Sequence, residues 1–193
     1  MDFLELAKKR YSTRQFQSKP VEKQKIEAII NAAHVAPTAA NLQPQKLLIL
    51  DSPEQLSKLA PFVDFYNAPF VIIVLADTAC SWKRPYDKKY FADIDCAIVT
   101  DHMMLEATSL DLGSVWIGYY SPEDVKKAFS IPQDLDVVTI LAIGYAEENT
   151  ALSPQRHSQT RKPISELIYN TEDFLWLTLL QRVHSLKKTK TLF

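Results

Sequence analysis

The chain has 193 residues, of which 47% are hydrophobic and 23% are charged, and its formal net charge at pH 7 is -1. This length suits a single domain with a core of its own, and the near-neutral charge argues against a protein that coats nucleic acid. The longest apolar run, residues 68–76, is much shorter than the roughly 20 residues needed to cross a bilayer. Any positive charge that matters for function must therefore be concentrated locally.

The N-terminus and the cysteines indicate a cytoplasmic protein. Asp2 and Glu5 precede any apolar stretch, which is unlike a secretory signal peptide. Cys80 and Cys96 form no Cys-x-x-Cys pair, and without a secretion signal a disulfide is not expected. We therefore expect no membrane and no nucleic acid among the partners.

Glycine is scarce, and its positions exclude two common phosphate sites. Only Gly113, Gly118 and Gly144 are present. A dinucleotide fingerprint needs three clustered glycines, and a P-loop needs two glycines followed by lysine and a hydroxyl residue. If a phosphate is bound, side chains must therefore hold most of it.

Apolar periodicity, prolines and capping residues predict the following elements in chain order. They are a helix at 2–9, a helix at 20–36, a strand at 46–50, a helix at 53–59, a strand at 70–75, a helix at 90–112, a strand at 114–117, a helix from 121, a strand at 137–143 and a helix at 163–169. Pro20 is the expected first residue of the second helix, and Ser121 followed by Pro122 is a strong helix start. Residues 70–75 are almost continuously apolar, which favours a strand covered on both faces. Helices and strands mix without strict alternation, so the expected fold class is α+β (three-layer α/β).

Segment 10–14 places two arginines and two hydroxyl residues at the end of the first helix. Arg10 and Arg14 stay charged, and their planar guanidinium groups suit the oxygens of a phosphate. A simpler interpretation is equally available from these residues alone. Cations are favoured at a helix C-terminus, and Ser12 can serve only as a cap.

Segment 37–44 combines small side chains with two carboxamides, Asn41 and Gln43, and ends in proline. Small residues let a flat ligand approach, and carboxamides can satisfy both its donors and its acceptors. The alternative is that both amides satisfy loop backbone, which is their commoner role. Together, segments 10–14 and 37–44 suggest a site for a planar molecule that carries a phosphate.

These two segments resemble the N-terminal signatures of the FMN-dependent nitroreductase family. They are Arg10-Tyr11-Ser12-Thr13-Arg14-Gln15-Phe16 and Ala36-Pro37-Thr38-Ala39-Ala40-Asn41-Leu42-Gln43-Pro44. Further similar segments follow in the family's order, over about residues 3–169: Ala68-Pro69-Phe70-Val71-Ile72, Leu112-Gly113-Ser114-Val115-Trp116-Ile117-Gly118, Ile143-Gly144-Tyr145 and Arg161-Lys162-Pro163-Ile164. Gln45 departs from the tryptophan that many members carry there, and Gln159 stands where some relatives have a second basic residue.

The resemblance implies a set of FMN-binding residues. Arg10, Ser12 and Arg14 would hold the phosphate and ribityl chain, with Arg161 as a second phosphate clamp. Ile117 and Gly118 would present backbone groups to the flavin ring, Asn67 would reach its polar edge, and Trp116 would contact it. The remaining implied residues are Pro37, Thr38, Ala39, Asn41 and Gln43, and segment 37–41 would come from the partner subunit.

The resemblance also implies an activity and an assembly. Residues 1–170 would form an FMN-binding domain with a mixed, mainly antiparallel sheet flanked by helices, in a homodimer. Residues 171–193 would be an extension that packs on the partner subunit. NADH or NADPH would reduce bound FMN, and an electron-poor small molecule such as a nitroaromatic or quinone would then be reduced in the same slot, by ping-pong kinetics. Because the flavin carries this chemistry, no catalytic side chain is implied.

Three alternatives stay open. The chain could bind flavin without turnover, for sensing, storage or flavin traffic, or it could catalyse another flavin reaction such as reductive dehalogenation or flavin breakdown. A metal site is the third, because His102 and Glu106 share a helix face next to Asp101. No second histidine-rich segment supplies further ligands, so we expect a charged helix surface and no metal.

Overall fold

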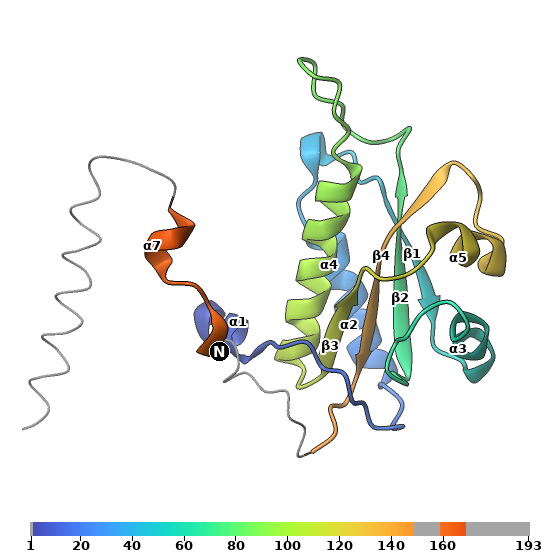
Figure 1. Ribbon diagram of the computed structural model, residues 1–193, viewed down its shortest axis with the longest axis vertical. Coiled ribbons are helices and arrows are strands. Elements are labelled where there is room, and N and C mark those ends of the chain that lie inside the picture. Colours follow the sequence, from blue (N-terminus) through green and yellow to red (C-terminus); the bar gives the residue numbers. More distant parts are fainter. Residues whose placement is uncertain (1, 149–158, 169–193) are drawn as a thin grey trace, which may run out of the picture. The chain divides into compact units, whose positions relative to one another are not determined.

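The computed structural model describes residues 2–148 and 159–168 (Figure 1). The chain divides into two compact units, Met1–Gln159 and Thr160–Phe193. In the second unit, the described residues contain helix α7 (Ile164–Leu167), with an ion pair between Lys162 Nζ and Glu166 Oε2 at 3.5 Å. The predicted extension, 171–193, lies outside the described residues.

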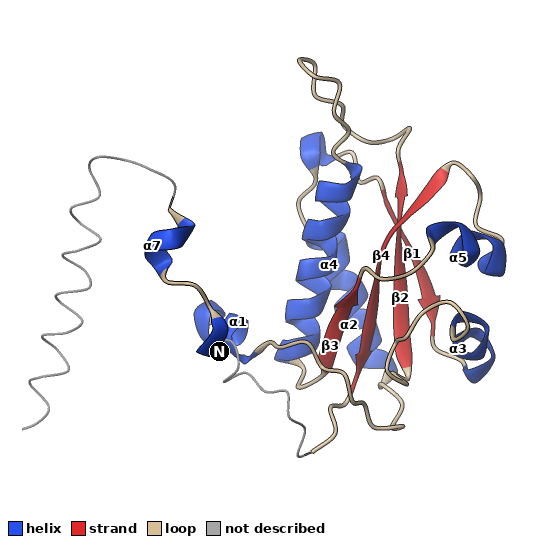
Figure 2. Ribbon diagram, in the orientation of Figure 1, coloured by secondary structure: helices blue, strands red, loops and turns tan. Residues whose placement is uncertain are grey.

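The first unit is built on a four-stranded sheet (Figure 2). Its strands are β1 (Gln45–Leu50), β2 (Phe70–Asp77), β3 (Gly113–Ile117) and β4 (Leu135–Gly144), in the order β1-β2-β4-β3. All neighbouring strands are antiparallel, so the expectation of a mixed sheet is wrong for the described strands. The reason is that strands running in the same direction are never neighbours here: β2 separates β1 from β4, and β4 separates β2 from β3.

Helices cover both faces of this sheet, as the three-layer prediction requires (Figure 1). On one face lie α2 (Lys23–Val35) and α4 (Ala92–Ser109), and on the other α3 (Pro53–Leu59) and α5 (Pro122–Phe129); α1 (Phe3–Lys9) precedes them. Strand β2 confirms its prediction, since Ile72 and Val74 pack on the first face while Val71 and Ile73 pack on the second. Side chains alternate along a strand, so a strand between two helical layers must be apolar throughout.

Local capping follows the sequence closely at two helices and departs from it at one. Ser121 caps α5 ahead of Pro122, as predicted, and Ser52 forms a capping box with Gln55 at the start of α3. Pro20 does not begin α2, because the first turn instead forms on the carbonyl of Glu22, and Lys23 is the first helical residue. In the part of the chain that the structure describes, no helix combines the length and apolarity of a membrane span.

Candidate functional site

The N-terminal segment is anchored along β3 by its backbone. Thr13 N–H donates to the carbonyl of Ser114 at 2.9 Å, and Ser12 forms an isolated parallel bridge with Ser114. A methyl group added at Gly113 would lie 2.5 Å from Thr13 Oγ1, so only glycine lets the two segments approach this closely. The close packing holds Ser12 and Arg14, two of the predicted phosphate ligands, at fixed positions beside the sheet.

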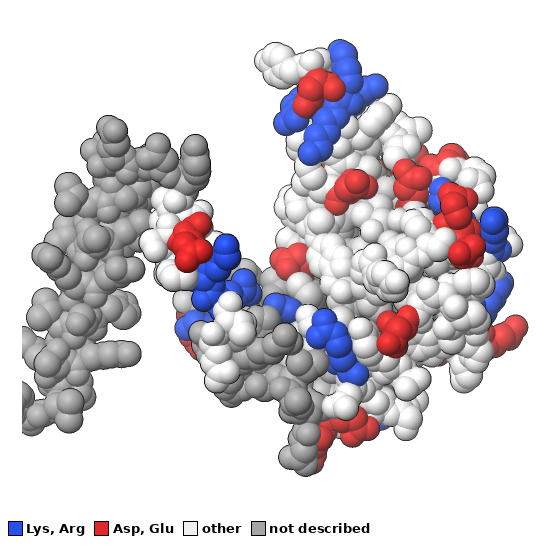
Figure 3. Space-filling model, viewed as in Figure 1, with Lys and Arg blue, Asp and Glu red and all other residues white. Residues whose placement is uncertain are grey.

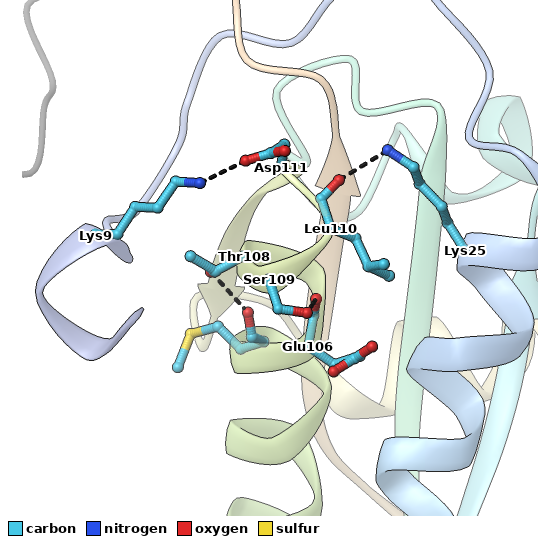
Figure 4. A network of polar contacts seen from close by, with 8 residues as sticks. Lys9, Lys25, Glu106, Thr108, Ser109, Leu110 and Asp111 are labelled. Atoms are coloured by element: carbon cyan, nitrogen blue, oxygen red, sulfur yellow. Dashed lines mark hydrogen bonds and ion pairs between the residues drawn. The ribbon is translucent and has the colours of Figure 1, made fainter. Parts of the chain in front are cut away.

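Helix α4 ends in a polar network that secures this region (Figure 4). Lys25 Nζ of α2 donates to the carbonyl of Leu110 at 2.7 Å, which satisfies a carbonyl at the end of α4. Lys9 of α1 pairs with Asp111 in the turn that leads to β3. Arg10 and Thr108 line a small hollow of about 180 Å³ at this end of α4.

A larger hollow of about 730 Å³ brings two of the predicted site residues together. It is lined by segments 60–67 and 118–121, so it contains both Asn67 and Gly118. Asn67 and the preceding Tyr66 have left-handed backbone, with φ of 57° and 59°, which is uncommon for tyrosine. The Arg14 guanidinium lies 5.9 Å from the centre of the Tyr66 ring. Asn67 and Gly118 therefore line one hollow, and Arg14 lies next to Tyr66, a third residue of its lining.

The wall of this hollow at Gly118 is open. A Cβ built there meets no heavy atom within 4 Å, and its backbone has no left-handed φ that would demand glycine. Ile117 is buried and its carbonyl accepts a hydrogen bond from Thr139 Oγ1 at 3.1 Å, while Trp116 is 38% exposed on the same strand. The absence of a side chain at Gly118 leaves room for a ligand rather than for the protein's own backbone.

Segment 37–43 is a strained loop at the start of α4. Ala40, Asn41 and Gln43 all have left-handed φ angles, 51°, 56° and 50°, and the turn Ala39–Asn41, labelled η1, was not predicted. Thr38 Oγ1 accepts from Gln43 N–H at 3.1 Å, and Gln43 Nε2 donates to the carbonyl of Asn41 at 3.0 Å. The carboxamide of Gln43 thus has the structural role that the sequence left open, whereas Asn41 and Pro37 are exposed.

Asp95 holds this loop, a role that was not predicted from the sequence. Its side chain is 1% exposed, and Oδ1 accepts from Ala39 N–H at 2.8 Å. A signal was present, because Asp95 falls on the buried stripe of α4 together with Ala92, Cys96 and Val99. A carboxylate on an apolar helix face needs a partner nearby.

Buried polar atoms without a partner gather at the same two places. Within residues 2–148 and 159–168 they are Thr13 Oγ1, Ser114 Oγ, Gln45 Oε1 and Asp95 Oδ2. Thr13 belongs to segment 10–14, here called the arginine segment, and Ser114 is bonded to it. Asp95 holds segment 37–43, here called the Asn41 loop, and Gln45 lies two residues beyond this loop. Unsatisfied buried groups are few in folded proteins, so their concentration at both predicted segments fits a binding function there.

Within one chain, the arginine segment and the Asn41 loop lie far apart. Arg10 shares its hollow with Thr108, whereas Ala39 is bonded to Asp95, thirteen residues earlier on α4. At about 1.5 Å per helical residue, these two points lie roughly 20 Å apart. The large hollow is separated from the Asn41 loop as well, because it lies beside the α3 and α5 face while α4 covers the other face. Arg161 is an exposed residue of the second unit.

Neither Cys96 nor Tyr120 supplies a ready nucleophile. Burial raises the pKa of the Cys96 thiol to about 12, with a further contribution from Asp93. Burial also raises the pKa of Tyr120, which lines the large hollow, to about 12. Among the described residues, no group of three His, Cys, Asp or Glu side chains could hold a metal ion.

The known proteins to which this chain is similar are described as nitroreductases. A family described as "Putative TM nitroreductase" matches residues 2–178. The crystal structure of a nitroreductase family protein from Clostridium difficile 630 is 46% identical with a TM-score of 0.84, covering 89% of this chain and 99% of that one. A "Putative NADH dehydrogenase/NAD(P)H nitroreductase" of Methanothermobacter thermautotrophicus is 35% identical over 77% of this chain and 80% of its own length. An FMN-dependent nitroreductase from Clostridium difficile R20291 is 26% identical with a TM-score of 0.66, covering 82% of this chain and 98% of that one.

Proposed function

The chain belongs to the nitroreductase family, and we propose that it is an FMN-dependent NAD(P)H oxidoreductase that reduces electron-poor acceptors such as nitroaromatics or quinones. The name of the Methanothermobacter relative supports the nicotinamide donor, and the FMN-dependent Clostridium difficile R20291 enzyme supports the cofactor. The alignments with these two proteins cover most of this chain and most of each relative.

The observation that carries the proposal is that Asn67 and Gly118 line one hollow, with Arg14 next to Tyr66 in the same lining. Each supplies what a flavin mononucleotide needs: a fixed positive charge, a carboxamide that both donates and accepts, and a wall without a side chain. The two unpaired hydroxyls of Thr13 and Ser114 beside the arginine segment agree with a polar ligand there. The residues present therefore fit the cofactor.

The chain's own residues would bind and orient. Arg10, Ser12 and Arg14 would hold the phosphate and ribityl chain through charge-assisted hydrogen bonds. Asn67 would bond the polar edge of the ring, and the backbone at Ile117 and Gly118 would lie along it beside Trp116. Bound FMN would supply the redox chemistry.

We propose further that each site is shared between the two subunits of a homodimer. The roughly 20 Å between the arginine segment and the Asn41 loop supports this arrangement, because residues 37–43 of one chain would then serve the partner's site. Exposed apolar side chains at Phe3, Ile94 and Trp116 supply surface that a second copy would cover. Donor and acceptor would enter one slot in turn, because the three dispersed glycines cannot build a separate dinucleotide site.

The visible spectrum of the purified protein tests the central proposal. A flavin spectrum that NADH or NADPH bleaches without oxygen, and that a quinone or nitroaromatic restores, is the expected result. A bound flavin that neither donor bleaches would favour a flavin-binding protein without turnover, and the absence of flavin binding would overturn the proposal. Initial rates with both substrates varied should give parallel double-reciprocal lines, whereas intersecting lines would refute the single slot.

A mixed dimer tests the shared site. Arg14→Ala and Asn41→Ala would each damage both sites of their own homodimers, from opposite sides. In a mixed dimer, isolated by two different affinity tags, one site would carry both lesions and the other none. It should recover close to half of the wild-type FMN occupancy and activity. Mixed dimers as poor as the parents, or a monomeric wild type, would overturn the arrangement.

A further inference from the structure

A basic hairpin projects from the start of α4. Residues 83–90, here called the basic arm, form the upper green hairpin in Figure 1, where Lys and Arg gather in Figure 3. The arm is ordered by backbone pairing, with an antiparallel bridge between Lys83 and Tyr90 and a hydrogen bond from Arg84 N–H to the carbonyl of Lys89 at 2.9 Å. At its base, the rings of Trp82 and Phe91 meet edge to face at 4.8 Å.

The charge of the arm is concentrated and largely uncompensated. It carries Lys83, Arg84, Lys88 and Lys89 against the single carboxylate of Asp87, a net charge of +3 in a chain whose total is -1. Arg84 pairs with Asp87 and holds the pKa of that carboxyl well below its usual range. Among the described residues, Lys88 and Lys89 form no side-chain ion pair. Free lysines grouped on a projecting hairpin suit a ligand with several phosphate charges.

The tip of the arm adds an aromatic surface. Tyr86 is 95% exposed between Arg84 and Lys88 in the sequence. An exposed ring among cations can stack on a base while the cations bind its phosphates. This combination points to a nucleotide rather than to an inorganic anion.

The position of the arm connects it with the proposed slot. Phe91, at its base, accepts a hydrogen bond from Asp95 N–H at 2.9 Å, and Asp95 in turn binds Ala39 through its side chain. The arm and the Asn41 loop therefore share the first turn of α4. If the Asn41 loop serves the partner's flavin site, the arm stands at the rim of the same slot.

We propose that the basic arm binds the phosphates of the nicotinamide donor and favours NADPH over NADH. This rests on the proposed function, in which the nicotinamide ring lies on the flavin. The remainder of the donor then extends out of the slot with its pyrophosphate and, in NADPH, an added 2′-phosphate. No glycine-rich loop is available for these groups, so side chains must bind them. Lys88 and Lys89 meet the 2′-phosphate or the pyrophosphate, and Tyr86 stacks on the adenine.

Three donors with decreasing phosphate content test the proposal. They are NADPH, NADH and reduced nicotinamide mononucleotide, each used with the same acceptor and the FMN-loaded protein. In the double variant Lys88→Glu/Lys89→Glu, the KM for NADPH should rise on the order of tenfold, because each exposed charge contact contributes a few-fold. The KM for NADH should rise less, the mononucleotide should be nearly unaffected, and kcat and the acceptor KM should stay unchanged.

Lys127→Glu is the matched control, since Lys127 is exposed on α5, which covers the other face of the sheet from α4. An equal rise in KM for all three donors, or a rise in the KM for NADPH as large in Lys127→Glu, would overturn the proposal. The proposed function would be unaffected by either result, because it is tested by the bleaching of the wild-type flavin. Calorimetry provides a readout without turnover. The wild type should bind NADP⁺ more tightly than NAD⁺, and the double variant should lose that difference. Equal affinities in the wild type would overturn the arm's role whether or not any donor reduces the flavin.

Discussion

The substitution Gly118→Ala should weaken ligand binding without destabilising the fold. A Cβ at this position meets no protein atom within 4 Å, and Gly118 has no left-handed φ. Gly118→Ala should therefore leave the stability of the apoprotein unchanged or raise it by about 0.4–1 kcal/mol, because alanine restricts the unfolded chain. The same methyl group would occupy the wall of the 730 Å³ hollow. If FMN lies there, overpacking by about 1–3 kcal/mol weakens its binding roughly 5- to 150-fold.

Gly113→Ala is the contrasting variant. Its Cβ would lie 2.5 Å from Thr13 Oγ1 and 2.9 Å from Thr13 Cβ, so the N-terminal segment must shift. A similar overpacking cost of about 1–3 kcal/mol would here fall on folding and lower the melting temperature by roughly 2–12 °C for a chain of this size.

Thermal unfolding of the apoproteins and quenching of FMN fluorescence measure the two effects. Gly118→Ala should not lower the melting temperature as far as Gly113→Ala does; an equal loss would show that the Gly118 site is packed against protein. If Gly118→Ala binds FMN as tightly as the wild type, the flavin lies elsewhere.

Three further predictions follow from single contacts. Arg14→Ala should weaken FMN about tenfold or more with little effect on riboflavin, because the lost charge-assisted hydrogen bonds go to the phosphate; equal weakening of both ligands in fluorescence titrations would contradict this role. Asp95→Ala should lower the free energy of unfolding in urea by about 1–3 kcal/mol, since it leaves a loop N–H without its acceptor, and Asp95→Asn should restore most of the loss. The Tyr145 hydroxyl and then the backbone lower the pKa of Glu22 from 4.5 to about 2, so this contact stabilises the fold above pH 4.5 and its contribution fades as the pH falls towards 2. The difference in melting temperature between the wild type and Tyr145→Phe should therefore shrink over that range, and a constant difference would show that the hydrogen bond does not act through ionised Glu22.

The elements that sequence predicts well are those whose signal lies within a few neighbouring residues. Strand β2 is continuously apolar because both of its faces are covered, and α5 begins at Ser121 and Pro122 because the cap and the proline suit its first turn. The start of α2 was predicted three residues early, since a proline can precede a helix as well as begin it. The turn Ala39–Asn41 gave no local signal, because alanine rarely adopts the left-handed φ found at Ala40.

Resemblance implied binding roles for Arg14, Asn67, Gly118 and Gln43. In the fold, Asn67 and Gly118 line one hollow and Arg14 lies next to Tyr66 of the same lining, while the carboxamide of Gln43 donates to the backbone of its own loop. No motif in the sequence pointed to Asp95, although it holds the Asn41 loop.

The order and type of the main elements and the absence of glycine-rich phosphate loops could be inferred from the sequence, and segments 10–14 and 37–44 suggested a planar ligand with a phosphate. These follow from near neighbours in the chain, whose periodicity, caps and charges act over a few residues. Only the tertiary structure decided that segments 60–67 and 118–121 line one hollow and that the basic arm rises beside the Asn41 loop. It also decided that this loop lies roughly 20 Å along α4 from the arginine segment. These relations depend on strand order and on helix α4 spanning the sheet, and such long-range packing leaves no mark in any short stretch of sequence.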